Sequence, residues 1–323
     1  MAEPVLSVRN LQVFFDTKYG HATAIRNIDF DVCKGEIIGI VGESGSGKTV
    51  ISKSIMRLLQ SPPANITGEI ILDGENLLTK TEAEMCEIRG KRISMIFQEP
   101  MVSLDPLFSI GNQMTEVIPF QNKMTKKQKK ERIIEMLHKV GIPSPETRLK
   151  QYPFELSGGM RQRVMIAMAL MCNPEVLIAD EPTTALDVTI QAQILDLLNN
   201  INTELGTSIL LITHDLGVIA EMVDRVIVVY AGNVVECASV HDIFKEPLHP
   251  YTEGLLRSIP SMDDSSEMLE TIEGSVPSIY ERGKGCSFCN RCKISKALCA
   301  EEEPPVVEHN GSQVKCWKYT AQW

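Results

Sequence analysis

The chain has 323 residues, 43% of them hydrophobic and 23% charged, an ordinary composition for one large or two moderate globular domains. Its formal net charge of −10 argues against nucleic acid as the main partner, because nucleic-acid binders usually present a basic surface. The lysine-rich run at residues 126–132 is the exception, and we interpret it as the solvated face of a helix.

No apolar run approaches the roughly 20 residues that a membrane-spanning helix needs. The longest runs, such as SILLI and VIVVY, have the length of strands. The N-terminal sequence MAEPVLSVRN lacks the pattern of a signal peptide. We therefore expect a soluble, cytosolic chain, and any membrane process that it serves would rely on other subunits to span the bilayer.

The N-terminal part predicts strands followed by a glycine-rich loop. Alternating apolar residues predict strands at 5–15 and 25–32, and the apolar run EIIGIV predicts a buried strand at 36–41. The loop GESGSGKT follows, and then a helix with Ile51 and Ile55 on its apolar face. SPPANITG, residues 61–68, has the composition of a turn, and strands are expected in GEIILDGENL and RISMIFQ.

From residue 99 the pattern changes to helical spacing, which predicts a helical subdomain at about 99–157. Beyond it, VLIADE predicts a buried strand, residues 190–205 a helix, SILLITHD a strand and RVIVVYAGNVVE a hairpin. Strands that alternate with helices predict an α/β fold with a parallel core. We place a domain boundary at 247/248, with residues 248–323 as a separate C-terminal domain rich in Pro, Ser and Cys.

Residues 42–49 fit the phosphate-binding P-loop pattern G-x-x-x-x-G-K-[ST]. Glycines let the backbone N–H groups wrap phosphates without Cβ clashes, the lysine reaches the β- and γ-phosphates, and the threonine holds Mg²⁺. The expected nucleotide-binding residues of this loop are Gly42, Ser44, Gly45, Ser46, Gly47, Lys48 and Thr49. A strand before the loop and a helix after it make this a P-loop NTPase rather than a chance glycine-rich turn.

Two acidic residues end a buried strand, where open α/β sheets bind ligands. Asp180 suits Mg²⁺ coordination through water, and Glu181 suits the general base that activates the attacking water. A second anion site is indicated at LSGGMRQRVMIAMAL, because Ser157, Gly158 and Gly159 stand at the start of a predicted helix, where free N–H groups and the helix dipole attract phosphate.

The ordered series of P-loop, Gln98, Ser157-Gly158-Gly159, Asp180-Glu181, Ala185-Leu186-Asp187 and His214 resembles the nucleotide-binding subunit of an ABC transporter over roughly residues 5–245. Met160 departs from the glutamine usual after the signature glycines. The resemblance implies that Gln98 touches Mg²⁺ or the attacking water and that His214 bonds the γ-phosphate. It also implies that Asp187 lies at a dimer interface and that an aromatic residue, Phe15 or else Tyr19, stacks on adenine. In this family the signature of one subunit caps ATP held by the P-loop of the other, which explains two phosphate sites in one chain.

Three further segments, QEPMVSLDPLFSIGNQM, HPYTEGLLRSIP and GCSFCNRCKISKALC, resemble the ATPase subunits of dipeptide and oligopeptide importers, a group that includes nickel and glutathione relatives. The resemblance implies a motor on the cytoplasmic face of the membrane, paired with a paralogous ATPase, two membrane permease subunits and an extracytoplasmic substrate-binding protein. The segment at about 98–114 would grip the membrane subunits.

Five of the nine cysteines crowd the C-terminus, which in a cytosolic chain favours metal ligands over disulfides. Four of them match a family pattern that in some members holds an iron–sulfur cluster: Cys286, Cys292, Cys299 and Cys316. Four thiolates suit a [4Fe–4S] cluster or zinc, and free thiols are the remaining alternative. Cys289 departs from the pattern and could compete as a ligand.

Three other classes of ABC protein fit these motifs less well. A DNA-repair or chromosome ATPase would need a long coiled-coil insert, a ribosome-associated ABC protein two sets of motifs, and a silent partner the loss of Glu181 or His214. The chain has a short insert, a single set and both residues.

Overall fold

The computed structural model describes the chain except residues 1–2, 19, 99–102, 119–123, 185 and 259–270. Tyr19 and Ala185 of the predicted motifs lie outside the described residues. The chain forms two compact units, one of Met1–Thr79 with Leu211–Trp323 and the other of Lys80–Leu210. These units follow other boundaries than the predicted domains 1–247 and 248–323, and that division stays a prediction.

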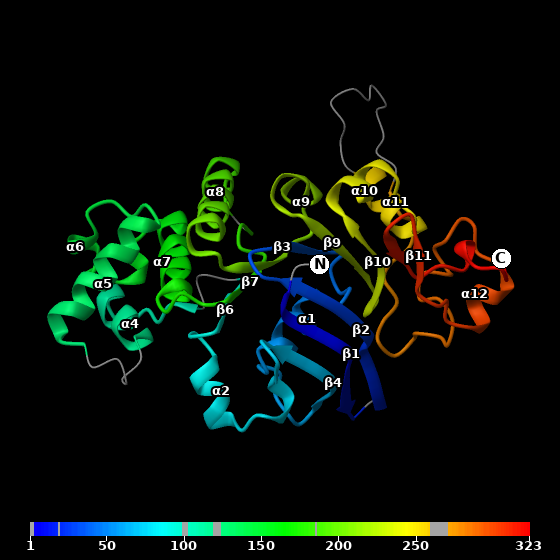
Figure 1. Ribbon diagram of the computed structural model, residues 1–323, viewed down its shortest axis with the longest axis horizontal. Helices are drawn as coiled ribbons and strands as arrows, with labels where there is room; N and C mark the ends of the chain where they lie inside the picture. The colour runs from blue at the N-terminus through cyan, green and yellow to red at the C-terminus, as the bar shows by residue number, and fades with distance from the viewer. Residues whose placement is uncertain (1–2, 19, 99–102, 119–123, 185, 259–270) are drawn as a thin grey trace. The chain divides into compact units, whose positions relative to one another are not determined.

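The first unit contains an antiparallel sheet of order β2-β1-β4-β5, whose blue and cyan strands lie side by side in Figure 1. Its strands are β1 (Pro4–Thr17), β2 (Gly20–Cys33), β4 (Ala64–Leu72) and β5 (Glu75–Asn76). The two strands predicted from alternation at the N-terminus are confirmed and run longer than expected. Residues 64–68, expected in a turn, are strand instead, because Ala64 and Ile66 pair with Phe15 and Val13 of β1.

The same unit holds a second group of strands, in the order β11-β12-β10-β9-β3. β3 (Ile37–Val41) is wholly buried and pairs in parallel with β9 (Arg225–Tyr230), from Ile38↔Arg225 to Val41↔Val228. A continuous apolar run such as Ile-Ile-Gly-Ile-Val is what a strand covered on both faces requires. β9 and β10 (Asn233–Ser239) form the predicted hairpin.

The C-terminal segment joins this sheet. β12 (Ser312–Val314) pairs with β10 through Glu236↔Val314, and β11 (Val307–His309) pairs with β12. A strand from the predicted C-terminal domain therefore pairs with a strand from the predicted ABC domain. The helices of the unit are α1 (Lys48–Ile55), α9 (Leu216–Met222), α10 (Val240–Lys245), α11 (Pro250–Arg257) and α12 (Ala297–Glu301), with short 3-10 turns at Leu77–Thr79 and Trp317–Tyr319.

The second unit contains two parallel strands, β6 and β7, and a group of helices. β6 (Ile93–Ile96) and β7 (Val176–Asp180) are buried and pair from Ile93↔Val176 to Ile96↔Ala179. β8 (Ser208–Ile212) contains the boundary between the units. Within the second unit the Ser208 N–H donates to the Glu175 carbonyl at 2.9 Å, and within the first the Thr213 N–H donates to the Ile40 carbonyl at 3.2 Å.

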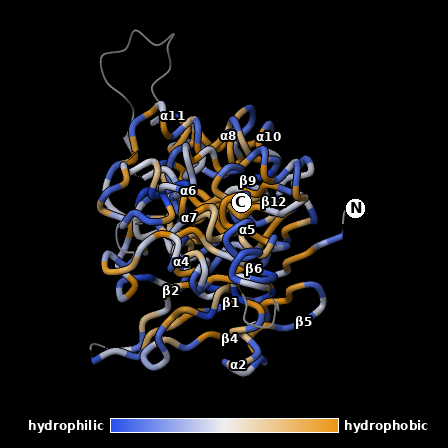
Figure 2. The backbone as a smooth tube through the Cα atoms, turned by 90° about the vertical axis from the view of Figure 1, so that its left-hand side faces the viewer, coloured by the Kyte–Doolittle hydropathy of each residue, from blue (hydrophilic) through white to orange (hydrophobic). Residues whose placement is uncertain are grey.

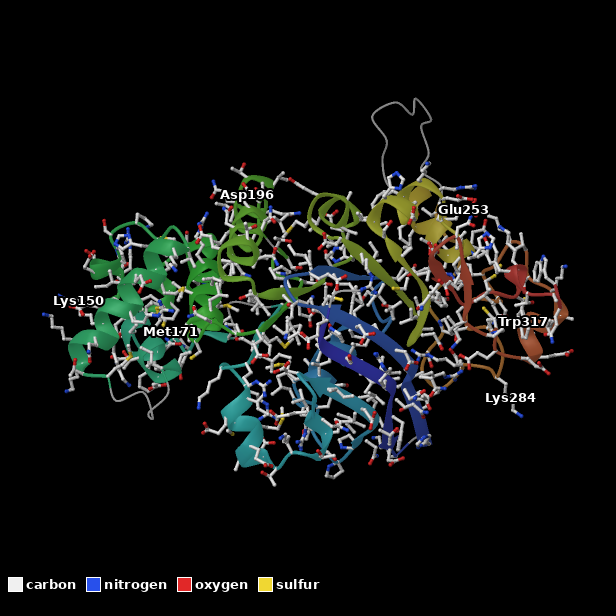
Figure 3. All side chains as sticks on the ribbon, in the orientation of Figure 1. Lys150, Met171, Asp196, Glu253, Lys284 and Trp317 are labelled. Carbon is white, nitrogen blue, oxygen red and sulfur yellow. The ribbon has the colours of Figure 1, made fainter. Side chains whose placement is uncertain are left out.

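The predicted helical character after Gln98 is confirmed among the described residues. The green helices α4 to α7 of Figure 1 lie together, and Lys150 and Met171, labelled in Figure 3, follow the ends of α6 and α7. α5 starts at a capping box in which Thr125 and Gln128 satisfy each other's backbone N–H groups, and its lysine-rich first half is largely exposed, as expected. The helices of the unit are α2 (Glu82–Ile88), α4 (Ile110–Val117), α5 (Lys126–Lys139), α6 (Pro145–Arg148), a 3-10 turn (Pro153–Glu155), α7 (Gly158–Leu170) and α8 (Val188–Leu205).

Hydropathy changes over short stretches along the described chain, as the alternating orange and blue of Figure 2 shows. Among the helices of the described residues, none combines the length and the apolar character that crossing a membrane requires.

Candidate nucleotide-binding site

The predicted P-loop connects β3 to α1 in the first unit. Gly42 has φ 154° and no room for a side chain, because a Cβ there would lie 2.2 Å from the Val229 carbonyl oxygen. Gly47 has φ 110° and forms the N-cap of α1. A left-handed backbone and a close approach to neighbours both favour glycine, which explains the glycine pattern of the loop.

The polar residues of the loop face in different directions. The Lys48 ammonium donates to the carbonyl oxygens of Gly42 at 2.7 Å and Glu43 at 3.1 Å. Ser46 is fully buried, and its Oγ has no hydrogen-bond partner among the described residues. Thr49 lies half-buried in the first turn of α1, while Ser44 and Gly45 are exposed. A buried hydroxyl without a partner and a lysine held over the loop carbonyls fit a site for the phosphates of a nucleotide.

The prediction that Phe15 stacks on adenine places it just after the first strand. The structure corrects that place, since β1 continues to Thr17 and Phe15 pairs with both Ala22 and Ala64. Phe15 is only half-buried, so its ring keeps an accessible part. Its role as a nucleotide contact stays a prediction.

The acidic pair lies in the second unit at the end of β7. Asp180 is the last residue of the strand and is 1% exposed. Glu181 follows with φ 48°, a left-handed conformation that costs a non-glycine residue free energy and tends to persist at functional sites.

Hydrogen bonds from Gln98 and Thr184 hold the Glu181 carboxylate. Gln98, which follows β6 as predicted, donates from Nε2 to Glu181 Oε2 at 2.8 Å. Thr184 donates from its hydroxyl to the same oxygen at 2.9 Å. Gln98 and Glu181 are exposed or half-exposed, so the carboxylate is both oriented and accessible to water.

The predicted signature forms the start of α7. The Ser157 hydroxyl caps the helix by accepting from the Met160 N–H at 3.3 Å, and Gly158 and Gly159 are its first two residues. Gly159 packs closely on α8, because a Cβ there would lie 2.9 Å from Ile190 Cγ2. The buried Gln162 amide donates to the Pro182 carbonyl at 2.6 Å, which ties α7 to the turn that carries Glu181.

Asp187 and His214 stand at the starts of two helical segments. Asp187 caps α8 by accepting from the Ile190 N–H at 2.9 Å. His214 is exposed and lies between β8 and Asp215, which caps α9. The dimer-interface role of Asp187 and the phosphate role of His214 stay predictions.

The predicted site residues therefore fall into two groups. Within the second unit, hydrogen bonds connect Gln98 to Glu181 and the signature helix to the adjacent turn. The P-loop, Phe15 and His214 belong to the first unit. The P-loop follows β3, Gln98 follows β6 and Glu181 follows β7. These are carboxyl ends of strands, where α/β sheets bind ligands.

The five C-terminal cysteines line one small pocket together with the aromatic residues Phe288 and Trp317. All five are free thiols, and burial raises the pKa of Cys286 to about 12 and raises the pKa values of Cys292 and Cys316. Among the described residues, no group of three or more His, Cys, Asp or Glu side chains is arranged so that it could hold a metal ion. A set of soft sulfur donors fits a cluster chemically, and the metal site itself stays a prediction.

The sequence does not predict the roles of several residues at the site. Thr184 and Gln162 stand within or beside the predicted motifs, yet their hydrogen bonds to the Glu181 turn could not be read from spacing. Tyr251 belongs to the HPYTEGLLRSIP segment, whose pattern indicates no role for this residue, and Arg291 lies among the C-terminal cysteines in sequence. Both contact Glu43 of the P-loop.

A P-loop between a buried parallel strand and a helix, a strand-end Asp-Glu pair and a serine–glycine helix start define an ATP-binding cassette. Residues 25–184 match the family described as ABC transporter, and residues 235–299 match the oligopeptide/dipeptide transporter C-terminal region. The oligopeptide transport ATP-binding protein AppD of Bacillus subtilis (strain 168) is 51% identical over 317 residues, 98% of this chain and 97% of AppD. The dipeptide transport ATP-binding protein DppD of the same organism is 49% identical over 98% of this chain and 95% of DppD.

Among solved structures, the dimeric post-hydrolysis state of the ATP-binding cassette MJ0796 bound to ADP and Pi matches with a TM-score of 0.65 and 28% identity, covering 73% of this chain and 98% of that one. The chain belongs to the ABC transporter family, among the ATP-binding proteins that carry the oligopeptide/dipeptide transporter C-terminal region. It is a transport ATPase, and the resemblance drawn from its ordered motifs is confirmed.

Proposed function

We propose that this chain is the ATP-hydrolysing motor of a peptide importer that carries dipeptides or oligopeptides. The observation that carries this proposal is similarity along nearly the whole chain to ATP-binding proteins named for oligopeptide and dipeptide transport, including the C-terminal region that bears their name. Import of nickel or glutathione by the same motor is the alternative, because the notable segments of this chain also resemble relatives of those kinds.

The P-loop binds the phosphates of ATP. Its backbone N–H groups and the Lys48 ammonium, which can exchange its two carbonyl partners for phosphate oxygens, supply the positive potential. Mg²⁺ neutralises phosphate charge when it is bound. Thr49, Gln98 and Asp180 carry the oxygen donors that this hard cation prefers.

Glu181 is the general base of hydrolysis. Its carboxylate accepts a proton from the water that attacks the γ-phosphorus, and ADP leaves with the electrons of the broken P–O bond. Gln98 and Thr184 fix the rotamer of the carboxylate through their hydrogen bonds to Oε2. His214 bonds the γ-phosphate from its position after β8.

ATP joins two cassettes head to tail. The N–H groups at the start of α7, with Ser157, Gly158 and Gly159, cap the γ-phosphate of a nucleotide held by a partner's P-loop. The partner is a paralogous ATPase, and the complex includes two membrane permease subunits and an extracytoplasmic substrate-binding protein. The chain lies peripherally on the cytoplasmic face of the membrane.

The segment at 98–114 is the contact surface for the permease subunits. Leu107 is 79% exposed and Phe108 is 49% exposed, and α4 begins directly after them. Large apolar side chains are costly to leave in water, so an apolar partner surface suits them.

The C-terminal cysteines hold a [4Fe–4S] cluster, with zinc as the alternative metal. Cys286, Cys292, Cys299 and Cys316 are the ligands, and the pocket that they line with Cys289 supports this proposal. Protein purified without oxygen should be brown and contain iron. A colourless product with stoichiometric zinc would favour zinc, and one with neither metal would leave free thiols.

The test of the motor is Glu181→Gln in cells. We expect hydrolysis to slow by roughly 10²- to 10⁴-fold, the usual worth of a general base, with an ATP-bound dimer trapped. Unchanged turnover would remove Glu181 from this role. Uptake of labelled peptides of two to about six residues should be lost while nickel and glutathione uptake persists. Intact peptide uptake with lost nickel or glutathione uptake would move the chain to a sister group.

A further inference from the structure

The second residue of the P-loop is held by the C-terminal segment of the same compact unit. Arg291 Nη1 donates to Glu43 Oε2 at 2.7 Å, and Arg291 Nη2 donates to Glu43 Oε1 at 3.1 Å. The arginine side chain is 5% exposed and the glutamate side chain 30%. Two parallel N–H···O bonds between a guanidinium and a carboxylate form the strongest and most directional kind of ion pair.

The backbone of Glu43 is held as well. Its N–H donates to the Tyr251 hydroxyl at 2.8 Å, and Tyr251 is completely buried in α11. Both the side chain and the main chain of this one residue therefore contact residues more than 200 positions away along the chain.

Arg291 is itself fixed in place, so it can act as a rigid support. Its Nε donates to the Glu273 carbonyl at 2.9 Å and its Nη2 to the Ile272 carbonyl at 3.1 Å. Its guanidinium lies over the ring of Tyr230, 5.7 Å from the centroid. A planar cation that stacks on an aromatic ring and uses its fork on a carboxylate has little rotamer freedom left to lose.

The residue held in this way also contacts the functional lysine. The Glu43 carbonyl accepts from Lys48 Nζ at 3.1 Å and from the Ser46 N–H at 3.1 Å. A displacement of Glu43 would move the carbonyl group to which Lys48 and Ser46 donate hydrogen bonds. The carboxylate would also add a negative charge to a loop that binds an anion, and Arg291 neutralises it.

We propose that Arg291 and Tyr251 are positioning residues for the P-loop, through which the C-terminal segment sets the affinity for ATP. The proposal rests on the proposed role of the P-loop in binding ATP. Arg291 keeps the Glu43 charge from repelling phosphate, and Tyr251 keeps the backbone of the loop in its binding shape. Neither residue touches the nucleotide.

The test measures ATP affinity of the purified full chain with a fluorescent ATP analogue, and KM and kcat for hydrolysis. Arg291→Gln should raise the Kd and the KM by about 10- to 100-fold and change kcat by less than about threefold, because an unpaired, partly buried carboxylate is left in the loop. Arg291→Gln combined with Glu43→Gln should recover most of the affinity, because the unpaired charge is gone. Tyr251→Phe, which keeps the buried ring, should raise the Kd by about threefold or more.

The matched control is Arg257→Gln in α11, which removes an arginine paired with Glu253, a residue labelled in Figure 3, and should leave the Kd within about twofold of wild type. Lys48→Ala distinguishes a failure of the proposed P-loop role from a failure of the positioning role. If Lys48→Ala binds ATP normally, the proposed P-loop role fails. If Lys48→Ala loses binding while Arg291→Gln binds like wild type, or if the double variant is as weak as Arg291→Gln, the positioning role is overturned.

Discussion

Gln98 and Glu181 are joined by a 2.8 Å hydrogen bond from the amide Nε2 to the carboxylate Oε2. The two residues follow the neighbouring parallel strands β6 and β7, whose register sets Ile96 opposite Ala179. Parallel pairing brings the carboxyl ends of the strands to one edge, so residues 83 positions apart meet there. The amide is thus in a position to orient the Glu181 carboxylate, which we propose as the general base.

Substitution Gln98→Ala should lower kcat for ATP hydrolysis by about 10- to 100-fold, because a hydrogen bond to a charged group is worth roughly 1.5–3 kcal/mol. Steady-state kinetics with Thr184→Val as a comparison checks this, since Thr184 donates to the same oxygen. A kcat within twofold of wild type in both variants would show that neither donor orients the catalytic carboxylate.

Gln162→Met should destabilise the chain by about 1–3 kcal/mol, because the Pro182 carbonyl would lose its donor in a buried place. Methionine keeps the length of the side chain, so the loss isolates the hydrogen bond. Urea unfolding measures it, and Gln193→Met, which removes a surface hydrogen bond with Arg163, should change stability by less than about 0.5 kcal/mol. Equal stability of the two variants would contradict this reading of Gln162.

The two signature glycines should respond differently to alanine. Gly158→Ala has room for the new methyl, which would lie 3.9 Å from Leu186 Cδ2, so stability should hold or rise by up to about 1 kcal/mol. Gly159→Ala would press on Ile190 Cγ2 and should cost about 1–3 kcal/mol.

The companion variant Ile190→Ala removes the opposing methyl and should recover part of the loss in Gly159→Ala. Thermal unfolding of the single and double variants measures this coupling. Strict additivity would mean that the two side chains do not compete for the same space. If the start of α7 caps phosphate as proposed, a Cβ at either glycine should also reduce ATPase activity, because it would hinder close approach.

Acidification should destabilise the first unit through His249. The ring is 1% exposed and its Nδ1 accepts from the Tyr251 N–H at 3.1 Å, so the folded protein keeps it neutral. Burial lowers the pKa of His249 from 6.5 to about 3. Only the unfolded chain therefore takes up this proton as the pH falls below about 6.5, and the free energy of unfolding should drop with a slope approaching 1.4 kcal/mol per pH unit.

Urea unfolding between about pH 7.5 and about pH 5 measures this slope. Asn at position 249 keeps an acceptor for the helix start but cannot titrate. His249→Asn should be less stable near neutral pH and show a shallower loss on acidification. The same pH dependence in both proteins would assign the acid effect to other groups.

The local elements of this protein could be predicted because their causes are local. The apolar run at residues 36–41 has no polar residue to place on a solvent face, so it forms the buried strand β3. The glycines of the P-loop adopt backbone conformations with positive φ that other residues avoid. The serine before Gly158 caps α7 through its own side chain.

The sequence by itself thus determined the phosphate-binding loops, the strand-end acids and the family to which they point. Only the tertiary structure decided that Gln98 reaches Glu181, that β12 pairs with β10 and that Arg291 pairs with Glu43 across 248 positions. Phe15 shows the same limit, because pairing on both sides extends β1 past the point where its alternation ends. Propensity and spacing act over a few residues, whereas these contacts depend on strand register and on which distant segments close together, and neither is written in a local pattern.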